Sequence, residues 1–430
     1  MFKRLFNRQS KINNQQPRDF FTAVTSRVDD SAGWTSLTGR RHDRDYSEIQ
    51  EMYTDALTAW RKNPIAYRII TITSSFVIGR NFQFSSKNPD LNRFIKSFWS
   101  HPKNQMELRL IPMCDELSRA GDLFVTLHRN PADGMSYIRF VTKDSIIKIE
   151  TEPNDWETEL AYYEVVPDQI EPRVWYSPQH PEAASTPGAA TANAVMLHYS
   201  VNRPIGALMG ESDLATMIPW LLRYSRMLED RVRLHWAARA FLYLVTVPSN
   251  KVESKAEQYR AAPESGSIII KDETEQWDTL TPSLRGADAG HDMKAVRNLI
   301  DAGSGYPPHW RGEGGDVNLA TAEAMQGPPE RSLVKRQQYF VYIIEDILYH
   351  AYQRAAQLGF YPNIKNTDYT LLFTPEIPDV SLRDNTMLAE AAKNMADALA
   401  TLQALKAASS DAAFTKLATD LVLKFAGVRN

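Results

Sequence analysis

The chain has 430 residues, of which 43% are hydrophobic and 23% are charged. A chain of this length divides typically into about two to four domains, and its composition is that of a globular protein, which excludes global disorder and collagen-like repeats. No apolar run reaches the roughly 18 to 20 residues that span a bilayer, and the basic first residues lack the apolar stretch of a secretory signal. The single cysteine, Cys114, excludes an internal disulfide and a multi-cysteine zinc site. We therefore expect a soluble protein made in a reducing compartment.

The net charge is −3, from 49 Lys and Arg against 52 Asp and Glu. A protein that grips nucleic acid by its phosphates usually carries a basic excess, because phosphate neutralisation supplies most of the affinity. The overall charge therefore argues against strong DNA binding. Residues 1–45 differ, with nine Lys and Arg against five Asp, or +4, among many Asn, Gln, Ser and Thr. We expect this segment to be a flexible basic arm.

Residues 46–200 show helical spacing first and strand alternation afterwards. Apolar periodicity predicts helices over residues 46–61, 65–77, 89–99 and 105–120, with Pro64 interrupting the first and Gly79 ending the second. Alternation predicts strands over residues 81–85, 123–129, 137–141, 146–150 and 160–166, and strands over 173–176 and 195–199 that extend the same meander. These patterns predict an α+β unit with a mostly antiparallel sheet.

Residues 211–243 predict one long helix, which at about 1.5 Å per residue would span roughly 50 Å. Apolar residues recur along it at spacings of three and four, which is the pattern of a narrow seam that packs on another helix. The members of this seam are Leu214, Ile218, Leu221, Leu228 and Val232. The other faces of the helix carry charges of both signs.

A small α/β segment follows this helix. We expect a strand over residues 241–248, a short helix over 252–260, and strands over 267–271 and 275–280, before helical spacing returns over 288–302. Residues 303–318 hold five glycines and two prolines and predict a loop. A second long helix is expected over 332–358, a strand over 370–373, and two last helices over 381–407 and 412–425.

The sequence contains no recognisable catalytic or metal-binding motif. It has no P-loop, no GxSxG turn and no HExxH, and none of its nine histidines is spaced as a zinc ligand to another. The acidic pairs Glu229-Asp230 and Glu345-Asp346 sit within helices, where adjacent side chains diverge, so we expect them on solvated or salt-bridged faces. Cys114 has apolar neighbours at helical spacing and is expected to be a buried, inert thiol. We expect no enzymatic activity, no metal and no cofactor.

The Gly/Pro-rich loop over residues 303–318 is the feature most suggestive of binding. Trp310 and Arg311 could stack on a base or grip a phosphate. The alternative is a flexible connection between helices, which explains the glycines and prolines without a ligand.

Five stretches, in this order, resemble the portal, or head–tail connector, proteins of tailed bacteriophages. They are NPIAYRIITITSSFVIG (residues 63–79), LSRAGDLFVTLHRNPADGMSYIRFVTKDSIIKIETEPND (117–155), MLHYSVNRPIGALMGESDL (196–214), the helix–α/β–helix arrangement of 211–302, and GSGYPPHW…EAM with the helix after it. Each stretch is weakly diagnostic alone, and their order carries the resemblance.

The resemblance implies a mainly helical α+β subunit of a ring, usually a dodecamer, at one vertex of a capsid in the virion. Its expected parts are a basic arm (1–45), a wing (46–210), two stem helices (211–243 and 288–302), a clip (244–287), a tunnel loop region (303–330), a tunnel helix with a wing return (331–380) and crown helices (381–430). Double-stranded DNA would pass through without sequence recognition. The expected partners are other copies of the chain, the terminase motor, capsid and scaffolding proteins and a head–tail adaptor, with assembly in the host cytoplasm.

Two sets of site residues follow from the resemblance as hypotheses. Trp310, Arg311 and Asn318 are expected to face DNA in the tunnel, because they punctuate the glycine-rich loop. Lys251, Lys255, Arg260 and Lys271 are expected to mark the clip surface for the terminase or the adaptor, because they decorate a small exposed module.

Two other functions remain open at this stage. An intracellular metal-dependent hydrolase could use the glycine-rich loop as a lid, although the sequence offers no cluster of carboxylates for the metal. A non-portal assembly or adaptor protein of a phage could be built on similar long helices.

Overall fold

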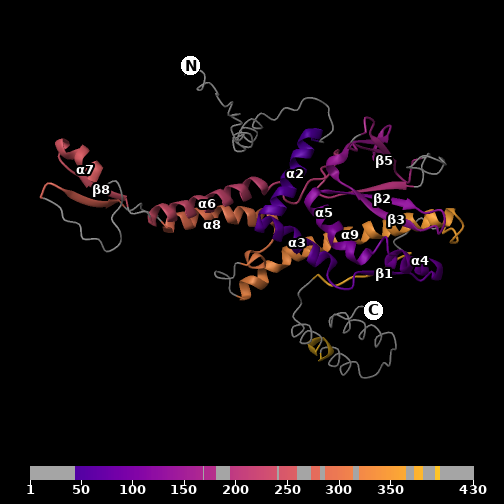
Figure 1. Cartoon of the computed structure of the whole chain (residues 1–430). Coiled ribbons are helices and arrows are strands. Elements are labelled where there is room, and N and C mark those ends of the chain that lie inside the picture. Colours follow the sequence, from indigo (N-terminus) through magenta and orange to yellow (C-terminus); the bar gives the residue numbers. More distant parts are fainter. Residues whose placement is uncertain are drawn as a thin grey trace, which may run out of the picture.

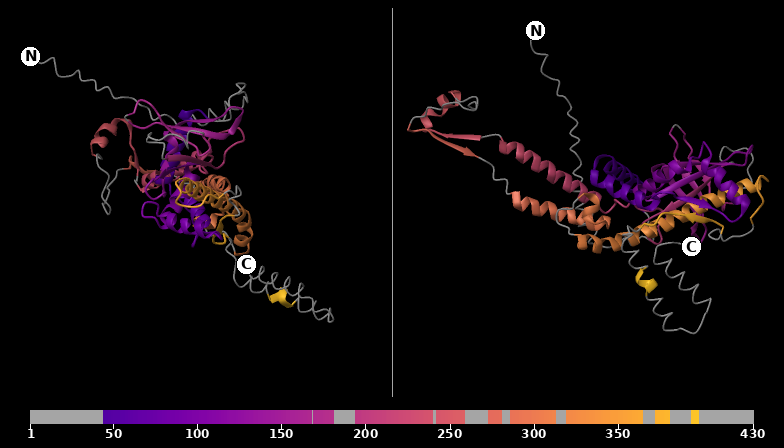
Figure 2. Two further views of the ribbon diagram at one scale, coloured as in Figure 1. Left: turned by 90° about the vertical axis from the view of Figure 1, so that its right-hand side faces the viewer. Right: turned by 90° about the horizontal axis from the view of Figure 1, so that it is seen from below.

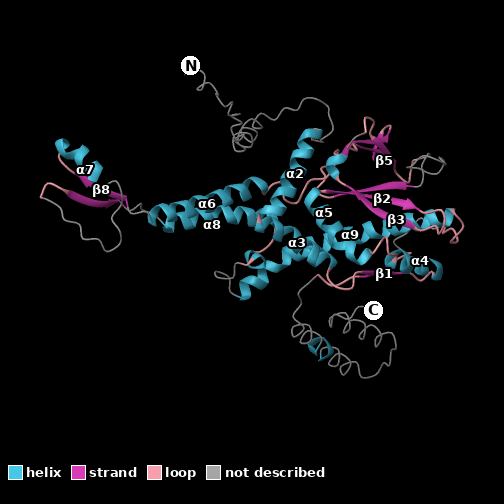
Figure 3. Cartoon of the chain, in the orientation of Figure 1, coloured by secondary structure: helices cyan, strands magenta, loops and turns pink. Residues whose placement is uncertain are grey.

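The computed structural model describes residues 44–167, 169–180, 194–239, 242–258, 273–280, 286–312, 319–364, 372–380 and 393–397. A compact wing (described residues 44–217 and 319–380) gives rise to a long stem of two helices, and a small tip (described residues 242–280) lies at the far end of the stem (Figure 1). Most strands lie in the wing, and one further pair lies in the tip (Figure 3).

The first two helices of the wing begin and end at residues that the sequence marks. Helix α2 covers Tyr46–Lys62 and α3 covers Pro64–Ile78. Between them the Asn63 side chain accepts hydrogen bonds from the backbone N–H groups of Ile65 and Ala66, which caps α3 with a proline at its first position. Helix α3 is buried over most of its surface, as its apolar content predicted. Both expected helices are therefore confirmed.

Helices α4 (Pro89–Ser100) and α5 (Met106–Ala120) complete the helical part of the wing. Asn88 caps α4 as Asn63 caps α3. Helix α5 buries Cys114 completely, and burial raises the pKa of that thiol, so the expected inert cysteine is confirmed. The helix ends at Gly121, which has a left-handed φ of 83°.

The wing contains two three-stranded sheets where the sequence suggested one meander, together with a two-stranded sheet. Strand β2 (Asp122–Arg129) lies between β3 (Ser136–Val141) and β7 (Ala194–Ser200), and all neighbours are antiparallel. Strands β4 (Ile146–Glu152), β5 (Asp155–Glu164) and β6 (Arg173–Tyr176) form the second sheet. Both later strands join strands of the expected meander, but the expectation of one continuous sheet was wrong, because β7 pairs with β2 and β6 pairs with β5 in separate sheets.

Helix α9 (Leu319–Gln357) runs through the core of the wing. Residues at helical spacing on it are fully buried, namely Phe340, Ile343, Ile344, Ile347, Leu348, Ala351, Tyr352 and Ala355. The predicted start at residue 332 was wrong, because the helix continues through Pro328 and Pro329. Proline removes hydrogen-bond donors from a helix but already has a helical φ, so the pair interrupts the ladder without ending the element.

The strand expected over residues 370–373 lies further along the chain. Strand β10 (Thr374–Glu376) pairs with β1 (Gln83–Ser85), and Pro375 faces Phe84. Both strands of this two-stranded sheet are edge strands, and edges are where larger sheets accept proline. Residues 365–371 lie outside the described part of the chain.

The stem consists of α6 (Ile218–Arg239) and α8 (Gly286–Ser304), which lie side by side (Figure 2). The expected first stem helix began at residue 211, but residues 213–217 form turns, and the helix starts at Ile218 with Pro219 in its first turn. Proline is favoured there because the first helical N–H groups have no intrahelical acceptor. Helix α6 also ends before the expected residue 243, since strand β8 begins at Leu242.

The tip contains strands β8 (Leu242–Thr246) and β9 (Gln276–Leu280), which pair antiparallel, and the short helix α7 (Val252–Gln258). The strand expected over residues 267–271 lies outside the described residues, and so do the two last helices except for a helical segment at 393–397. Within the described ranges, no helix combines the length and the apolar character needed to cross a membrane.

The chain segment that leads into the stem crosses the α5–β2 turn at very close range. The backbone N–H of Val201 donates to the Gly121 carbonyl oxygen at 2.8 Å, and the N–H of Glu211 donates to the Val201 carbonyl at 3.1 Å. A Cβ atom on Gly121 would collide with the backbone of Glu211, and one on Gly210 would collide with the carbonyl oxygens of Gly121 and Val201. Glycine at both positions is what lets the two backbones touch.

We predict that Gly121→Ala lowers the free energy of unfolding by at least about 2 kcal/mol, because it adds a left-handed strain to the backbone collision. Urea denaturation of purified protein measures the change. Gly290→Ala is the matched control: a Cβ at this position in α8 meets nothing within 4 Å, so alanine should leave stability unchanged or raise it by about 0.5 to 1 kcal/mol. Equal behaviour of the two variants would contradict this reading of the crossing.

Candidate functional site: the stem and its junction with the wing

A buried network of charged side chains joins the two sheets to the segment that enters the stem. The Asp122 carboxylate lies 3.0 Å from His198 Nε2, 2.6 Å from Lys143 Nζ and 2.7 Å from the backbone N–H of Gly210. Lys143 also donates to the carbonyl oxygens of Ala120 and Gly210. Asp122 and Lys143 are 1% and 3% exposed, so burial removes their hydrogen bonds to water. The partners in this network take the place of those lost hydrogen bonds.

His198 links this cluster to the second sheet. Its Nδ1 lies 2.9 Å from a Glu159 carboxylate oxygen on β5, and its ring stacks on Phe124 with centroids 4.3 Å apart. Burial alone would lower the His198 pKa, but the carboxylates of Glu159 and Asp122 outweigh it and raise this pKa to about 9. Burial opposes the ionised forms of Asp122 and Glu159 as well, yet His198 lowers both of their pKa values, together with Lys143 at Asp122.

Sequence reasoning missed this network. Gly121-Asp122 and His198 fall within two stretches on which the resemblance rested, but nothing in the pattern showed that they meet. The available signal was a carboxylate at the first position of a strand whose next three residues are apolar, because a buried acid requires a cation.

We predict that stability falls as pH rises from about 6.5 to 9. A histidine whose folded pKa lies above its unfolded value stabilises fully below the unfolded pKa and loses that contribution as pH passes the folded pKa. A rise from 6.5 to about 9 corresponds to at most about 3 kcal/mol. His198→Gln should flatten the pH dependence of the denaturation midpoint over this range, whereas His235→Gln, at an exposed position of α6, should leave the slope as it is. A wild-type slope preserved in His198→Gln would contradict the assignment.

The predicted apolar seam of the stem divides into two halves. Leu214, Ile218 and Leu221 are buried against α3 and against Ile300 of α8. Further along α6, Leu228 and Val232 are exposed, Val232 by 54%. Trp236 is 73% exposed, although the sequence analysis did not include it in the seam. The inner half therefore fastens the stem to the wing, and the outer half of α6 presents apolar side chains that the described residues of the chain cover only in part.

Two of the four basic residues expected on the clip surface lie within the described tip. Lys255 forms a 2.9 Å ion pair with the buried Glu275, and Lys251 Nζ lies 3.5 Å from the Thr274 hydroxyl. Both side chains therefore connect the η3–α7 segment (Ser249–Gln258) to the chain just before β9. Arg260 and Lys271 lie outside the described residues.

Two of the three expected tunnel residues lie in the 3-10 turn η4 (Pro308–Arg311) and are held there by packing. The Trp310 ring stacks on Phe76 of α3, with centroids 4.8 Å apart, and on Tyr306 at 5.8 Å. The Arg311 guanidinium pairs with Asp301 of α8, and both side chains are nearly buried. Asn318 lies outside the described residues. The structure thus brings Trp310 and Arg311 together at the foot of the stem, and their contact with DNA stays a prediction.

We predict that Trp310→Ala destabilises the chain by about 2 kcal/mol, because it removes a large, partly buried ring from two stacking contacts. Denaturation of the monomeric chain measures this loss. Trp236→Ala makes the same chemical change at an exposed position and should alter monomer stability by less than about 0.5 kcal/mol. Equal stability of the two variants would show that the η4 packing contributes nothing.

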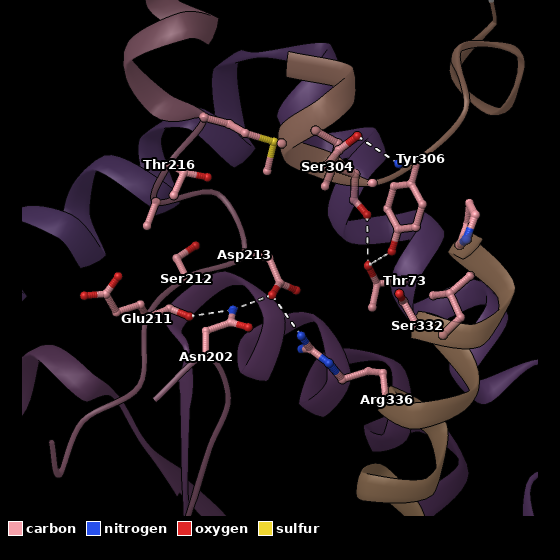
Figure 4. Close-up of a pocket in the computed structure, with 17 residues that line it drawn as sticks. Thr73, Asn202, Glu211, Ser212, Asp213, Thr216, Ser304, Tyr306, Ser332 and Arg336 are labelled. Atoms are coloured by element: carbon pink, nitrogen blue, oxygen red, sulfur yellow. Dashed lines mark hydrogen bonds and ion pairs between the residues drawn. The ribbon is translucent and has the colours of Figure 1, made fainter. Parts of the chain in front are cut away.

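A cavity of about 350 Å³ lies between α3, the start of α9 and the segments on either side of the stem (Figure 4). The Asp213 carboxylate lies 2.9 Å from Arg336 and accepts a hydrogen bond from Asn202 at 2.7 Å. Across the cavity, the Thr73 and Tyr306 hydroxyls are 2.7 Å apart. These polar groups pair with one another. The interactions in the cavity wall therefore link the segments beside the stem to the helices of the wing.

The acidic pair Glu345-Asp346 was expected on a solvated or salt-bridged helix face; the solvated face was wrong, and Asp346 lies 3.4 Å from His350 Nε2. Both side chains are largely buried in the wing, because α9 passes through its core. Asp346 accepts a hydrogen bond from the Tyr199 hydroxyl at 2.7 Å, and burial raises the Glu345 pKa to about 7. Across the described ranges, no group of three His, Cys, Asp or Glu side chains is placed to hold a metal ion.

No protein-family model and no curated protein matches the sequence. Among solved structures, the chain is similar to a chain of the virion of the native gene transfer agent particle, with 14% identity and a TM-score of 0.50, over 92% of this chain and 99% of that one. It is also similar to a chain from the neck of the empty gene transfer agent particle, computed with C6 symmetry, with 12% identity and a TM-score of 0.51 over 89% and 95%.

An HK97-family phage portal protein from Corynebacterium diphtheriae matches 66% of this chain and 85% of its own length, with 12% identity and a TM-score of 0.32, which is too low to support an argument. The gene transfer agent chains share the fold of this chain over nearly its whole length. The expected mainly helical α+β fold is confirmed, and this shared fold is consistent with the resemblance seen in the sequence.

Proposed function

We propose that this chain is a portal protein, which assembles as a closed ring at one vertex of a capsid and forms a channel for double-stranded DNA. The observation that carries the proposal is the arrangement of wing, stem and tip, which a chain of the gene transfer agent neck matches over 95% of its length. The six-fold symmetry with which that neck was computed is compatible with a ring, and we propose a dodecamer.

The uncovered half of α6 supports a ring. Leu228, Val232 and Trp236 project from an isolated pair of helices, where exposed apolar side chains of this size mark a protein contact. A closed ring needs a heterologous contact, in which one face of each copy meets a different face of the next. The stem satisfies this if α6 of one copy packs against the neighbouring stem.

The charge of the chain suits a conduit. The chain of 430 residues has a net charge of −3, so its overall charge does not attract the phosphates of DNA. A strongly basic channel would bind the phosphates and slow translocation. We propose a structural role with no catalysis by this chain, and we assign the hydrolysis that drives packaging to a separate motor.

We propose that the tip docks the terminase motor and later a head–tail adaptor, with Lys251, Lys255, Arg260 and Lys271 on or beside the contact surface. Because Lys255 is paired with Glu275, its part in this surface is to hold α7 in place. In the tunnel, we propose Asn318 as the DNA-facing residue, with Trp310 and Arg311 fixing the start of its loop. The wing would contact capsid and scaffolding proteins.

The experiment that tests the proposal is native mass spectrometry of the purified chain combined with negative-stain imaging. We expect closed rings with an axial hole wide enough for duplex DNA. Leu228→Asp with Val232→Asp should abolish the rings and leave a folded monomer, because two buried charges in every contact would lack partners. Leu228→Met with Val232→Ile keeps the apolar surface and should retain them. A wild-type chain that stays monomeric at all concentrations would overturn the proposal.

A further inference from the structure

A cluster of three cations lies where α4 leads into α5, and no carboxylate of the described residues pairs with it. Lys103 and Arg139 are exposed and Arg109 is half-buried, and none of them forms an ion pair within the described part of the chain. Arg109 and Arg139 both donate to the Lys103 carbonyl oxygen, each at 3.1 Å. The two guanidinium groups are thereby held beside one another, and no described carboxylate lies in ion-pair contact with either of them.

The local backbone adds to this positive field. Gln105, which precedes α5, has a left-handed φ of 44° and caps the helix with no side-chain hydrogen bond. The first N–H groups of a 15-residue helix, which carry partial positive charge, therefore lie beside the cations without a side-chain acceptor. Burial and the neighbouring Arg139 lower the Arg109 pKa, which is the effect of a charge that lacks a counterion.

Apolar side chains adjoin the cations and indicate a protein partner. Leu108 is 70% exposed on α5, Ile111 lies one turn further on the same face, and Phe140 of β3 carries the Arg109 guanidinium over its ring. A DNA backbone would leave these three side chains in water, whereas a polypeptide with carboxylates would cover them and neutralise the charges.

The chain itself supplies a surface of the opposite charge. The hairpin of β4 and β5 projects from the wing (Figure 1) and carries Glu150, Glu152, Asp155 and Glu157, all exposed, near its turn. Lys148, 4.0 Å from Glu150, is the only cation paired with any of these four within the described residues. Glu152 and Glu157 have no ion pair there at all.

We propose that the acidic β4–β5 hairpin of one copy docks on the Lys103–Arg109–Arg139 surface of the next copy in the ring. Within one chain, the three cations repel one another, and so do the carboxylates of the hairpin. A contact between the two clusters would reduce both repulsions. The contact is heterologous, as a ring requires, and it lies in the wing, apart from the α6 contact of the stem. This inference rests on the proposed ring and names a second pair of surfaces within it.

The test is charge reversal in two separate chains, which are then mixed. We expect Arg109→Glu with Arg139→Glu, and separately Glu152→Lys with Glu157→Lys, each to raise the protein concentration for half-assembly by about tenfold or more. The mixture should regain rings that contain both chains, because the reversed charges again face opposite signs. Lys87→Glu with Lys96→Glu changes the same charge at exposed wing positions without ion pairs, and should assemble as the wild type does.

The outcomes separate this inference from the proposed function. A wild-type chain that forms no ring overturns both. A wild-type ring with reversed variants that assemble equally well, or whose mixture regains nothing, overturns the hairpin contact and leaves the ring standing. Thermal denaturation of each monomer checks that the substitutions, including the one at half-buried Arg109, leave the fold intact.

Discussion

The structure depends on one buried carboxylate at the crossing of two backbones. Asp122 follows directly on Gly121, and its side chain bonds to the N–H of Gly210 across the crossing. A charge buried this deeply is tolerated only with close partners, and Lys143 and His198 supply them. Because Lys143 precedes β4 and His198 lies on β7, satisfying Asp122 fixes both sheets relative to the segment that enters the stem. The direction in which the stem leaves the wing follows from this geometry.

The apolar seam of the stem is buried at one end and exposed at the other. Leu214, Ile218 and Leu221 pack against α3 and so fix the angle between the stem and the wing, whereas Val232 and Trp236 are exposed. A helix pair that buried none of its seam would have no fixed angle to the wing. The inner part of the seam therefore belongs to the fold of the subunit, and the exposed part is the surface on which the proposed ring contact rests.

The sequence predicted elements where a local signal defines them and failed where the partner is distant. Asn63 and Gly79 show why: a cap and a left-handed end are properties of a few neighbouring residues, so α3 could be placed to within a residue. The pairing of β7 with β2, the burial of Glu345-Asp346 and the network around His198 join residues far apart in the chain, and periodicity carries no information about them. The starts of α6 and α9 failed for opposite reasons, since Pro219 was placed in the interior of the expected helix although it lies in the first turn of α6, whereas the expected α9 began only after Pro328 and Pro329 although the helix continues through them.

The candidate site shows the same difference between what local sequence signals predict and which partners the folded chain provides. Trp310 and Arg311 stood out because aromatic and basic residues are rare in a glycine-rich loop, yet the structure gives them partners at the foot of the stem in Phe76 and Asp301. The stacked ring and the ion pair fasten the turn η4 to α3 and to α8 at the foot of the stem. A ring that could stack on a base also stacks on another ring, and a guanidinium that could bind a phosphate also binds a carboxylate. The residue types that suggested binding therefore also predict a packed turn, and only the positions of their partners in the folded chain distinguish the two.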